Sequence, residues 1–236
     1  TSLAVSKEKD QGYDYSDSNG EKDFIDRSNI FLAAKAFNDS GLELELLTRY
    51  AEEHYKYDST NSSASNAAGY VVDDISLYAD RDEGAASLDL KWHTNESQHR
   101  HNLLISRTEY SESQNGAKST QEDQLSSRYL FSKSLDNYDI NESSEILTLF
   151  LGGYKDENSL SSSNNRSGEN YALEYNKNWS EYDIVQAGIR HSTSNKFKSA
   201  TTWKSSASKG FGFRGLSLLL EAGTGVVNPA YSEING

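Results

Sequence analysis

The chain has 236 residues and a formal net charge of -13, with 25% charged and 35% hydrophobic residues. The acidic balance argues against a nucleic-acid partner, because phosphate contacts need Lys and Arg. The absence of Cys excludes disulfides, thiolate zinc sites and cysteine nucleophiles. Aromatic residues nevertheless reach 11%, with 15 Tyr. Few aliphatic and many aromatic side chains are typical of transmembrane β-barrels, where one face of each strand is polar.

No signal peptide is visible at the start of the given sequence. There is no Met anywhere, so we expect that Thr1 is not a native translation start. No apolar run approaches the ~20 residues of a transmembrane helix. Barrel strands need only ~9–11 residues of alternating character.

Alternation with a period of two recurs along the chain and predicts β-strands. In 42–50, Leu42, Leu44 and Leu46 oppose Glu43 and Glu45. The segments 146–154, 171–179, 182–191 and 216–222 alternate in the same way. The predicted strands are 1–13, 24–37, 42–56, 76–93, 98–112, 121–135, 144–156, 168–179, 182–191, 198–211 and 215–226.

Segment 171–179 assigns side chains to the two faces of the predicted sheet. Tyr171, Leu173, Tyr175 and Trp179 are expected to face lipid, with Trp179 at the periplasmic interface. The opposite face would line a polar lumen; its predicted members are Ala172, Glu174, Asn176, Asn178, Gln186 and Arg190.

The connections between the predicted strands alternate in length. Short turns at 38–41, 94–97, 180–181 and 212–215 fall at one end, together with the longer 136–143. Segments 15–23, 58–74, 112–120 and 157–168 fall at the other end. Short periplasmic turns and long outer loops are typical of outer-membrane barrels. A soluble sandwich with uneven loops is the alternative, and its inner faces should be richer in Ile, Val and Phe.

Two clusters are candidate metal sites. Asp14, Asp17 and Asp23, together with Asn19, offer the hard oxygen ligands that Ca²⁺ prefers, in a predicted outer loop without EF-hand spacing. His93, His99 and His101 cluster around a predicted turn, and His99 and His101 share a face; surface histidines are the simpler interpretation.

Catalysis has no support in the sequence. No Ser lies in a GxSxG setting, and no HExxH or Walker motif occurs. We therefore expect that the chain is not an enzyme and holds no cofactor. A Ca²⁺ in the outer loops is a candidate ligand, with a solvated turn at 13–23 as the alternative.

Several stretches resemble the mid-barrel of TonB-dependent outer-membrane transporters. They are GIRHS (188–192), TTWKSSASKGF (201–211) and LSLLLEAGTGVVNPAYSEING (216–236). KDFIDRSNIFLAAKAF (22–37) is similar to an early descending strand of that family. Within the family the arrangement is most similar to cobalamin and siderophore receptors.

The resemblance implies that residues 1–236 are one partial domain of an antiparallel up-and-down transmembrane β-barrel. Family barrels have 22 strands around a plugged lumen, so about half of the barrel would be present and the plug domain absent. The last segment would be an outer loop, in which Asn228, Tyr231 and Glu233 are candidate ligand-binding residues. Loops 58–74, 157–168 and 227–236 are candidates for ligand contact.

The implied function is active uptake of a scarce metal chelate, such as a siderophore, haem or cobalamin, across the bacterial outer membrane. The partners would be TonB, acting through the plug domain and its TonB box, outer-membrane lipid or lipopolysaccharide, and the chelate. A passive porin-like channel and a soluble calcium-binding β-rich adhesion module remain alternatives.

Overall fold

The computed structural model describes residues 1–12, 22–65, 69–93, 97–160, 165–211 and 216–225. These residues form strands, turns and loops, and none of them lies in a helix. The strands are β1 (Ser2–Asp10), β2 (Ile25–Phe37), β3 (Leu42–Lys56), β4 (Ser59–Thr60), β5 (Val71–Val72), β6 (Tyr78–Trp92), β7 (His99–Gln114), β8 (Ala117–Ser134), β9 (Glu145–Asn158), β10 (Arg166–Asn178), β11 (Ile184–Ser194), β12 (Ala200–Gly210) and β13 (Ser217–Gly223).

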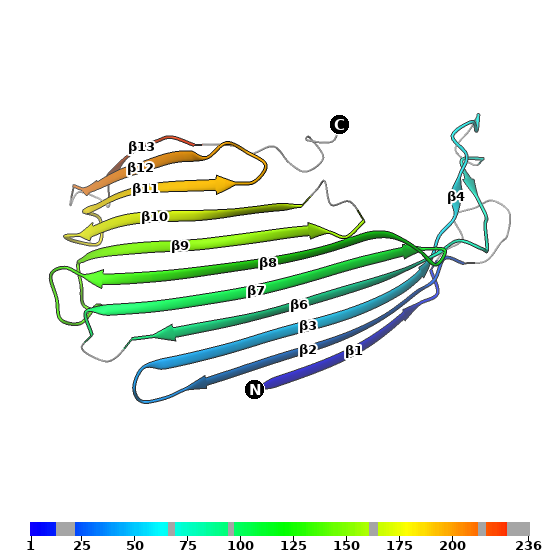
Figure 1. Ribbon diagram of the computed structural model, residues 1–236, viewed down its shortest axis with the longest axis horizontal. Helices are drawn as coiled ribbons and strands as arrows, with labels where there is room; N and C mark the ends of the chain where they lie inside the picture. The colour runs from blue at the N-terminus through cyan, green and yellow to red at the C-terminus, as the bar shows by residue number, and fades with distance from the viewer. Residues whose placement is uncertain (13–21, 66–68, 94–96, 161–164, 212–215, 226–236) are drawn as a thin grey trace.

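Eleven of these strands make one antiparallel sheet in chain order, β1-β2-β3-β6-β7-β8-β9-β10-β11-β12-β13. β4 and β5 form a separate two-stranded hairpin that projects from one end of the sheet (Figure 1). All eleven strands predicted from the sequence are present, and the predicted all-β, up-and-down antiparallel order is confirmed. Among the described residues the sheet is open, with β1 and β13 at its edges, so the predicted membership of a transmembrane barrel, about half of which was expected in this chain, is not shown.

The two ends of the sheet carry different connections. One end, called the turn end, holds 38–41, 93–98, 135–144, 179–183 and 211–216; the opposite end is called the loop end. At the turn end, Gly41 adopts a φ of 80°, and the Asn38 side chain accepts hydrogen bonds from the Ser40 and Leu42 amides at 3.1 and 3.0 Å. Glycine supplies the positive φ at no steric cost, and the asparagine side chain stabilises the turn by accepting hydrogen bonds from backbone amides that follow it.

The predicted loop at 112–120 is wrong. β7 and β8 continue to a two-residue turn, in which Asn115 and Gly116 have φ values of 51° and 76°. Positive φ at both central positions is the geometry of a type I′ hairpin, for which Asn-Gly is the preferred sequence. Segment 58–74, predicted as a loop without strands, contains β4 and β5.

Residues 135–144 form a packed connection at the turn end. Ile140 is buried at its centre, and the buried Ser134 hydroxyl donates to the Asn137 carbonyl at 2.6 Å. The Asp136 carboxylate accepts from the Ser143 hydroxyl at 2.7 Å and from the Ser144 and Glu145 amides at 3.2 Å each. These bonds join the end of β8 to the beginning of β9.

The described residues enclose almost no hydrophobic core. Their buried hydrophobic side chains are Ala51, Ala79, Ile140 and Ala172, three of which are alanines. Apart from the small β4–β5 hairpin, the strands form one large sheet, so the described part of the chain does not have the two large facing sheets of a sandwich. The large aliphatic side chains therefore lie on the surface of the sheet.

Candidate functional site

One face of the sheet carries an unbroken row of apolar and aromatic side chains. Residues directly opposite each other in neighbouring antiparallel strands share a face. Following the register from β3 to β12 gives Leu42, Trp92, His101, Phe131, Leu149, Leu173, Ile189 and Trp203. The row crosses eight strands and contains no Asp, Glu, Lys or Arg.

Parallel rows widen this strip into what we call the apolar belt. Its side chains are substantially exposed: Leu173 is 44%, Trp203 48% and Ile189 53% exposed. The belt comprises the row above together with Leu3, Val5, Ile30, Leu32, Leu44, Leu46, Leu88, Leu90, Leu103, Ile105, Tyr129, Leu147, Leu151, Tyr171, Tyr175, Val185, Ala187, Leu218 and Leu220. An exposed apolar surface that spans a whole sheet marks a membrane or protein interaction surface.

Charged pairs border the belt at both ends of the strands. At the turn end, the Lys177 ammonium pairs with the Glu145 carboxylate directly opposite. At the loop end, Arg107 pairs with Asp123 from the neighbouring strand, and Lys155 lies opposite Leu125 one strand further along. The sequence predicted this segregation by face, but its limits along the strands follow only from the register.

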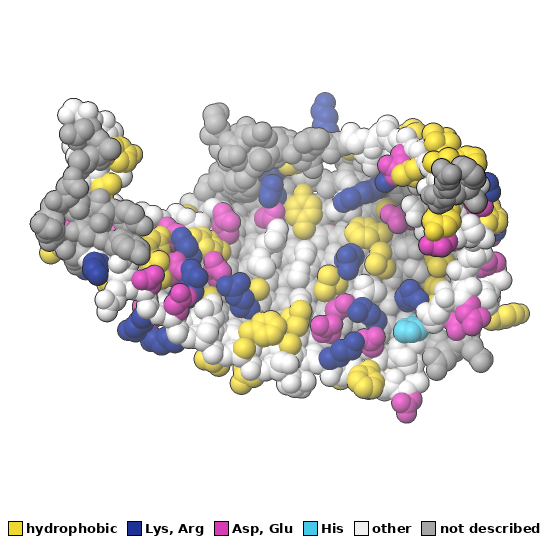
Figure 2. Space-filling view, turned by 180° about the vertical axis from the view of Figure 1, so that it is seen from behind, with side chains coloured by type: hydrophobic (Ala, Val, Ile, Leu, Met, Phe, Trp, Pro, Cys, Tyr) yellow, Lys and Arg dark blue, Asp and Glu magenta, His cyan; other side chains and the backbone are white. Residues whose placement is uncertain are grey.

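The opposite face is polar. One of its rows runs through Glu45, Asp89, Leu104, Arg128, Gly152, Asn170 and Ser192. Hydroxyl pairs cross between strands, with Ser106 and Ser126 at 2.7 Å and Ser132 and Thr148 at 2.9 Å. The side of the molecule seen in Figure 2 carries acidic and basic side chains interspersed among uncharged ones.

A charge network lies on the polar face near the loop end. The guanidinium of Arg81 lies 3.2 Å from the Glu53 carboxylate and 3.2 Å from the Glu112 carboxylate. The Arg27 Nε donates to Glu53 at 2.6 Å, and the Tyr110 hydroxyl donates to Glu112 at 2.7 Å. Glu53 is only 9% exposed, so its charge depends on the two arginines for compensation.

An aromatic cluster marks the turn-end border of the belt. The ring of His101 stacks on Trp92 with centroids 5.2 Å apart, and His99 stacks on Phe131 at 5.5 Å. The His101 Nδ1 lies 2.7 Å from the Tyr129 hydroxyl. Lys177 lies over the ring of Trp179, whose side chain is 62% exposed just beyond β10.

His99 and His101 share the belt face, as predicted. His93 follows Trp92 and has the parity of the polar face, so the three histidines do not converge. Among the described residues, no group of three or more His, Asp or Glu side chains is arranged to hold a metal ion. The two histidines of the belt face each stack on a neighbouring aromatic ring, His101 on Trp92 and His99 on Phe131.

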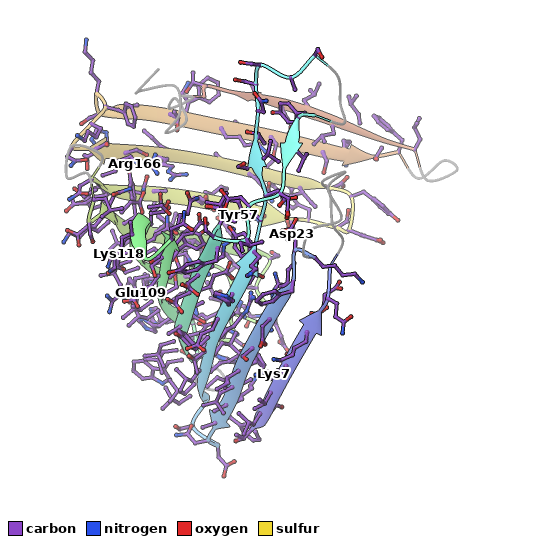
Figure 3. The ribbon with its side chains drawn as sticks, turned by 90° about the vertical axis from the view of Figure 1, so that its right-hand side faces the viewer. Lys7, Asp23, Tyr57, Glu109, Lys118 and Arg166 are labelled. Atoms are coloured by element: carbon purple, nitrogen blue, oxygen red, sulfur yellow. The ribbon has the colours of Figure 1, made fainter. Side chains whose placement is uncertain are left out.

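Most of the other predicted site residues lie outside the described residues. These are Asp14, Asp17 and Asn19 of the calcium prediction, and Asn228, Tyr231 and Glu233 of the ligand-binding prediction. Asp23 is described, and lies at the loop end in Figure 3, where its carbonyl closely approaches Gly12. Gly12 has a φ of 61°, and an added Cβ would lie 1.5 Å from that carbonyl oxygen.

Glu174, Asn176, Gln186 and Arg190 occupy the polar face, as predicted from alternation. The network around Arg81 is not evident in the sequence, because its members come from four strands that are distant in sequence. Only the register brings Glu53, Arg81 and Glu112 into one row.

No family model, curated protein or solved structure matches this chain. In the described residues, no helix is long and apolar enough to cross a membrane.

Proposed function

We propose that this chain forms part of the wall of an outer-membrane β-barrel, with the apolar belt against lipid and the polar face toward an enclosed lumen. The observation that carries the proposal is the continuous apolar belt on one face of a single sheet. A stable water-soluble domain would bury these side chains, whereas lipid accepts them without any facing layer.

The height of the belt fits a membrane. The ten residue steps from Glu145 to Lys155 on β9 correspond to ~34 Å along a strand at ~3.4 Å per residue. At the ~35–45° tilt of barrel strands this distance projects to about 25 Å, the height of the apolar band of outer-membrane barrels. The aromatic cluster at the turn end then lies where aromatic girdles lie, at the edge of the hydrocarbon.

We further propose that the barrel is an uptake receptor for a scarce metal chelate that works with TonB. This finer proposal rests on the resemblance of 188–236 to TonB-dependent transporters. The polar face would contribute the lumen wall. A passive channel would use the same wall, and the two are distinguished by whether uptake of an iron chelate requires TonB in cells.

The wall proposal is tested by a pair of neighbouring substitutions on β10. Leu173→Lys puts a charge in the apolar belt, whereas Glu174→Lys puts the same side chain on the polar face. In lipid vesicles we expect Leu173→Lys to lower the free energy of unfolding by ~2–4 kcal/mol. Glu174→Lys should change it by ~0.5 kcal/mol or less.

The readout is urea-induced unfolding in vesicles, together with the heat-dependent shift in gel mobility typical of folded outer-membrane barrels. Equal effects of the two substitutions would contradict the assignment of faces. A folded monomer in detergent-free buffer with no affinity for vesicles would favour the soluble alternative.

A further inference from the structure

A hollow of about 600 Å³ lies on the polar face between β9 and β12, near the loop end. It is lined by side chains of Tyr154, Arg166, Asn170, Arg190, Ser192 and Lys198. Arg166 opens β10 at the loop end, where Figure 3 labels it. Such a hollow has the volume of a site for a small organic molecule.

The charge of this hollow is opposite to that of the protein. Its lining carries three basic side chains, Arg166, Arg190 and Lys198, and one acidic side chain, Asp156. The local sum is therefore +2, in a chain whose formal net charge is -13. A positive concavity in an acidic protein concentrates anions within it.

Arg190 is held in place by a neutral partner. Its Nη2 donates to the Asn170 Oδ1 at 2.7 Å, and the same oxygen accepts from the Ser192 hydroxyl at 2.8 Å. Within the described residues, no carboxylate forms an ion pair with Arg190. Arg166 differs, because its Nη2 lies 2.9 Å from Asp156. A guanidinium has five N–H donors, so Arg190 retains donors for an incoming oxyanion.

Tyr154 and Phe197 supply aromatic rings to the lining. A Cβ added at Gly168 would lie 2.7 Å from Tyr154 Cε1 and 2.9 Å from its hydroxyl oxygen. The tyrosine ring therefore lies across the glycine, directly opposite it in the register. The absence of a side chain at Gly168 gives the ring this position beside the two arginines.

We propose that this hollow binds the oxyanion group of a ligand, a carboxylate or a phosphate, through a fork of hydrogen bonds from Arg190. The ring of Tyr154 contacts the body of the ligand, and Lys198 adds a second positive charge. This proposal rests on the proposed function, because the hollow faces the lumen only if the sheet is part of a barrel wall. It adds the class of chemical group that the lumen wall recognises.

The test is isothermal titration calorimetry of the protein in nonionic detergent, at low ionic strength, with citrate and with inorganic phosphate as probes. We expect binding of at least one probe, and the comparison of the two distinguishes carboxylate from phosphate recognition. Arg190→Gln should weaken binding about tenfold, because it removes a charge-assisted fork. Arg190→Lys, which keeps the charge without the fork, should weaken it less.

Arg49→Gln is the matched control. It removes the same charge from the polar face of β3, outside the hollow, where Arg49 pairs with Glu83 at 3.4 Å. Equal affinity of the wild type and Arg190→Gln, or equal weakening in Arg190→Gln and Arg49→Gln, would overturn the proposal. The heat-dependent gel shift is recorded on the same samples. If the wild type shows the gel shift but its binding does not depend on Arg190, the anion site is refuted and the barrel is not. If the wild type shows no gel shift, the barrel proposal itself is refuted.

Discussion

Individual side chains in this protein stabilise connections and charges rather than a core. Asp136 is the clearest example outside the strands, because its carboxylate accepts hydrogen bonds from two backbone amides and two hydroxyls. The hydrogen bonds from Ser144 and Ser143 lower the pKa of Asp136 from 3.8 to about 2. The hydrogen bond from the Ser76 hydroxyl likewise lowers the pKa of Asp74.

The pKa of Asp136 predicts an acid-sensitive connection between β8 and β9. Because the folded pKa is lowered, the stabilisation is complete above pH 3.8 and is lost as the pH falls through about 2. Hydrogen exchange of the Ser144 and Glu145 amides, corrected for intrinsic rates, should therefore become faster as the pH falls from 3.8 to about 2. Asp136→Asn, which cannot ionise, should remove the pH dependence.

Asp139→Asn is the control for this experiment. Asp139 lies in the same connection, and its carboxylate accepts from the Asn141 amide at 2.8 Å rather than from Ser144 or Glu145. The acid response of the latter two amides should persist in this variant. If it disappears, the dependence belongs to the connection as a whole and not to Asp136.

The charge network gives a second residue-scale prediction. Arg81→Met leaves Glu53 and Glu112 without their shared cation, and Glu53 is nearly buried. We expect the free energy of unfolding in vesicles to fall by ~2 kcal/mol. Arg49→Met breaks an exposed pair with Glu83 and should cost no more than ~1 kcal/mol. Similar losses in both variants would argue against a special role for the network.

At the scale of elements, turn chemistry sets where one strand ends and the next begins. Asn-Gly flanked by alternating residues is a strong hairpin signal, yet the polar composition of 112–120 favoured a loop. β7 continues through these polar residues because β6 pairs with it, Glu112 with Arg81 and Gln114 with Ala79. The start of β8 in turn pairs with β7 across the hairpin, Ala117 with Gln114 and Lys118 with Ser113. Pairing across the sheet thus overrides local composition.

The Asn115–Gly116 turn predicts a measurable backbone effect. Gly116→Ala places a Cβ on a residue with φ of 76°, which should lower the free energy of unfolding by ~1 kcal/mol. Gly84→Ala is the matched control, because its added Cβ would lie 3.8 Å from the nearest atom and its φ is ordinary. Its effect should be within ~0.5 kcal/mol. Urea titration in vesicles measures both, and a neutral Gly116→Ala would contradict the turn geometry.

At the scale of the whole molecule, the two faces of the main sheet differ in polarity. The apolar belt crosses every strand of the main sheet, while polar rows cross the other face. Because the described residues enclose so little core, the stability of the sheet in this arrangement depends on what covers the belt. Lipid hydrocarbon is the proposed cover.

Tryptophan fluorescence tests this cover directly. Trp203 lies on the belt, so in a Trp92→Phe, Trp179→Phe variant its emission should be quenched strongly by brominated acyl chains and weakly by aqueous acrylamide. In the Trp92→Phe, Trp203→Phe variant, Trp179 reports the turn-end border and should be more accessible to acrylamide. Strong acrylamide quenching of Trp203 without bromine quenching would contradict burial of the belt in lipid.

The sequence by itself determined the class of fold, the eleven long strands and the face of each side chain, because a period of two is a local property of an extended chain. Leu173 and Glu174, for example, were assigned to opposite faces correctly from alternation alone. Only the tertiary structure decided the register in which neighbouring strands pair, because these contacts join residues that are distant in sequence. The network around Arg81 and the hollow at Arg190 depend on that register, and so does the border of the belt.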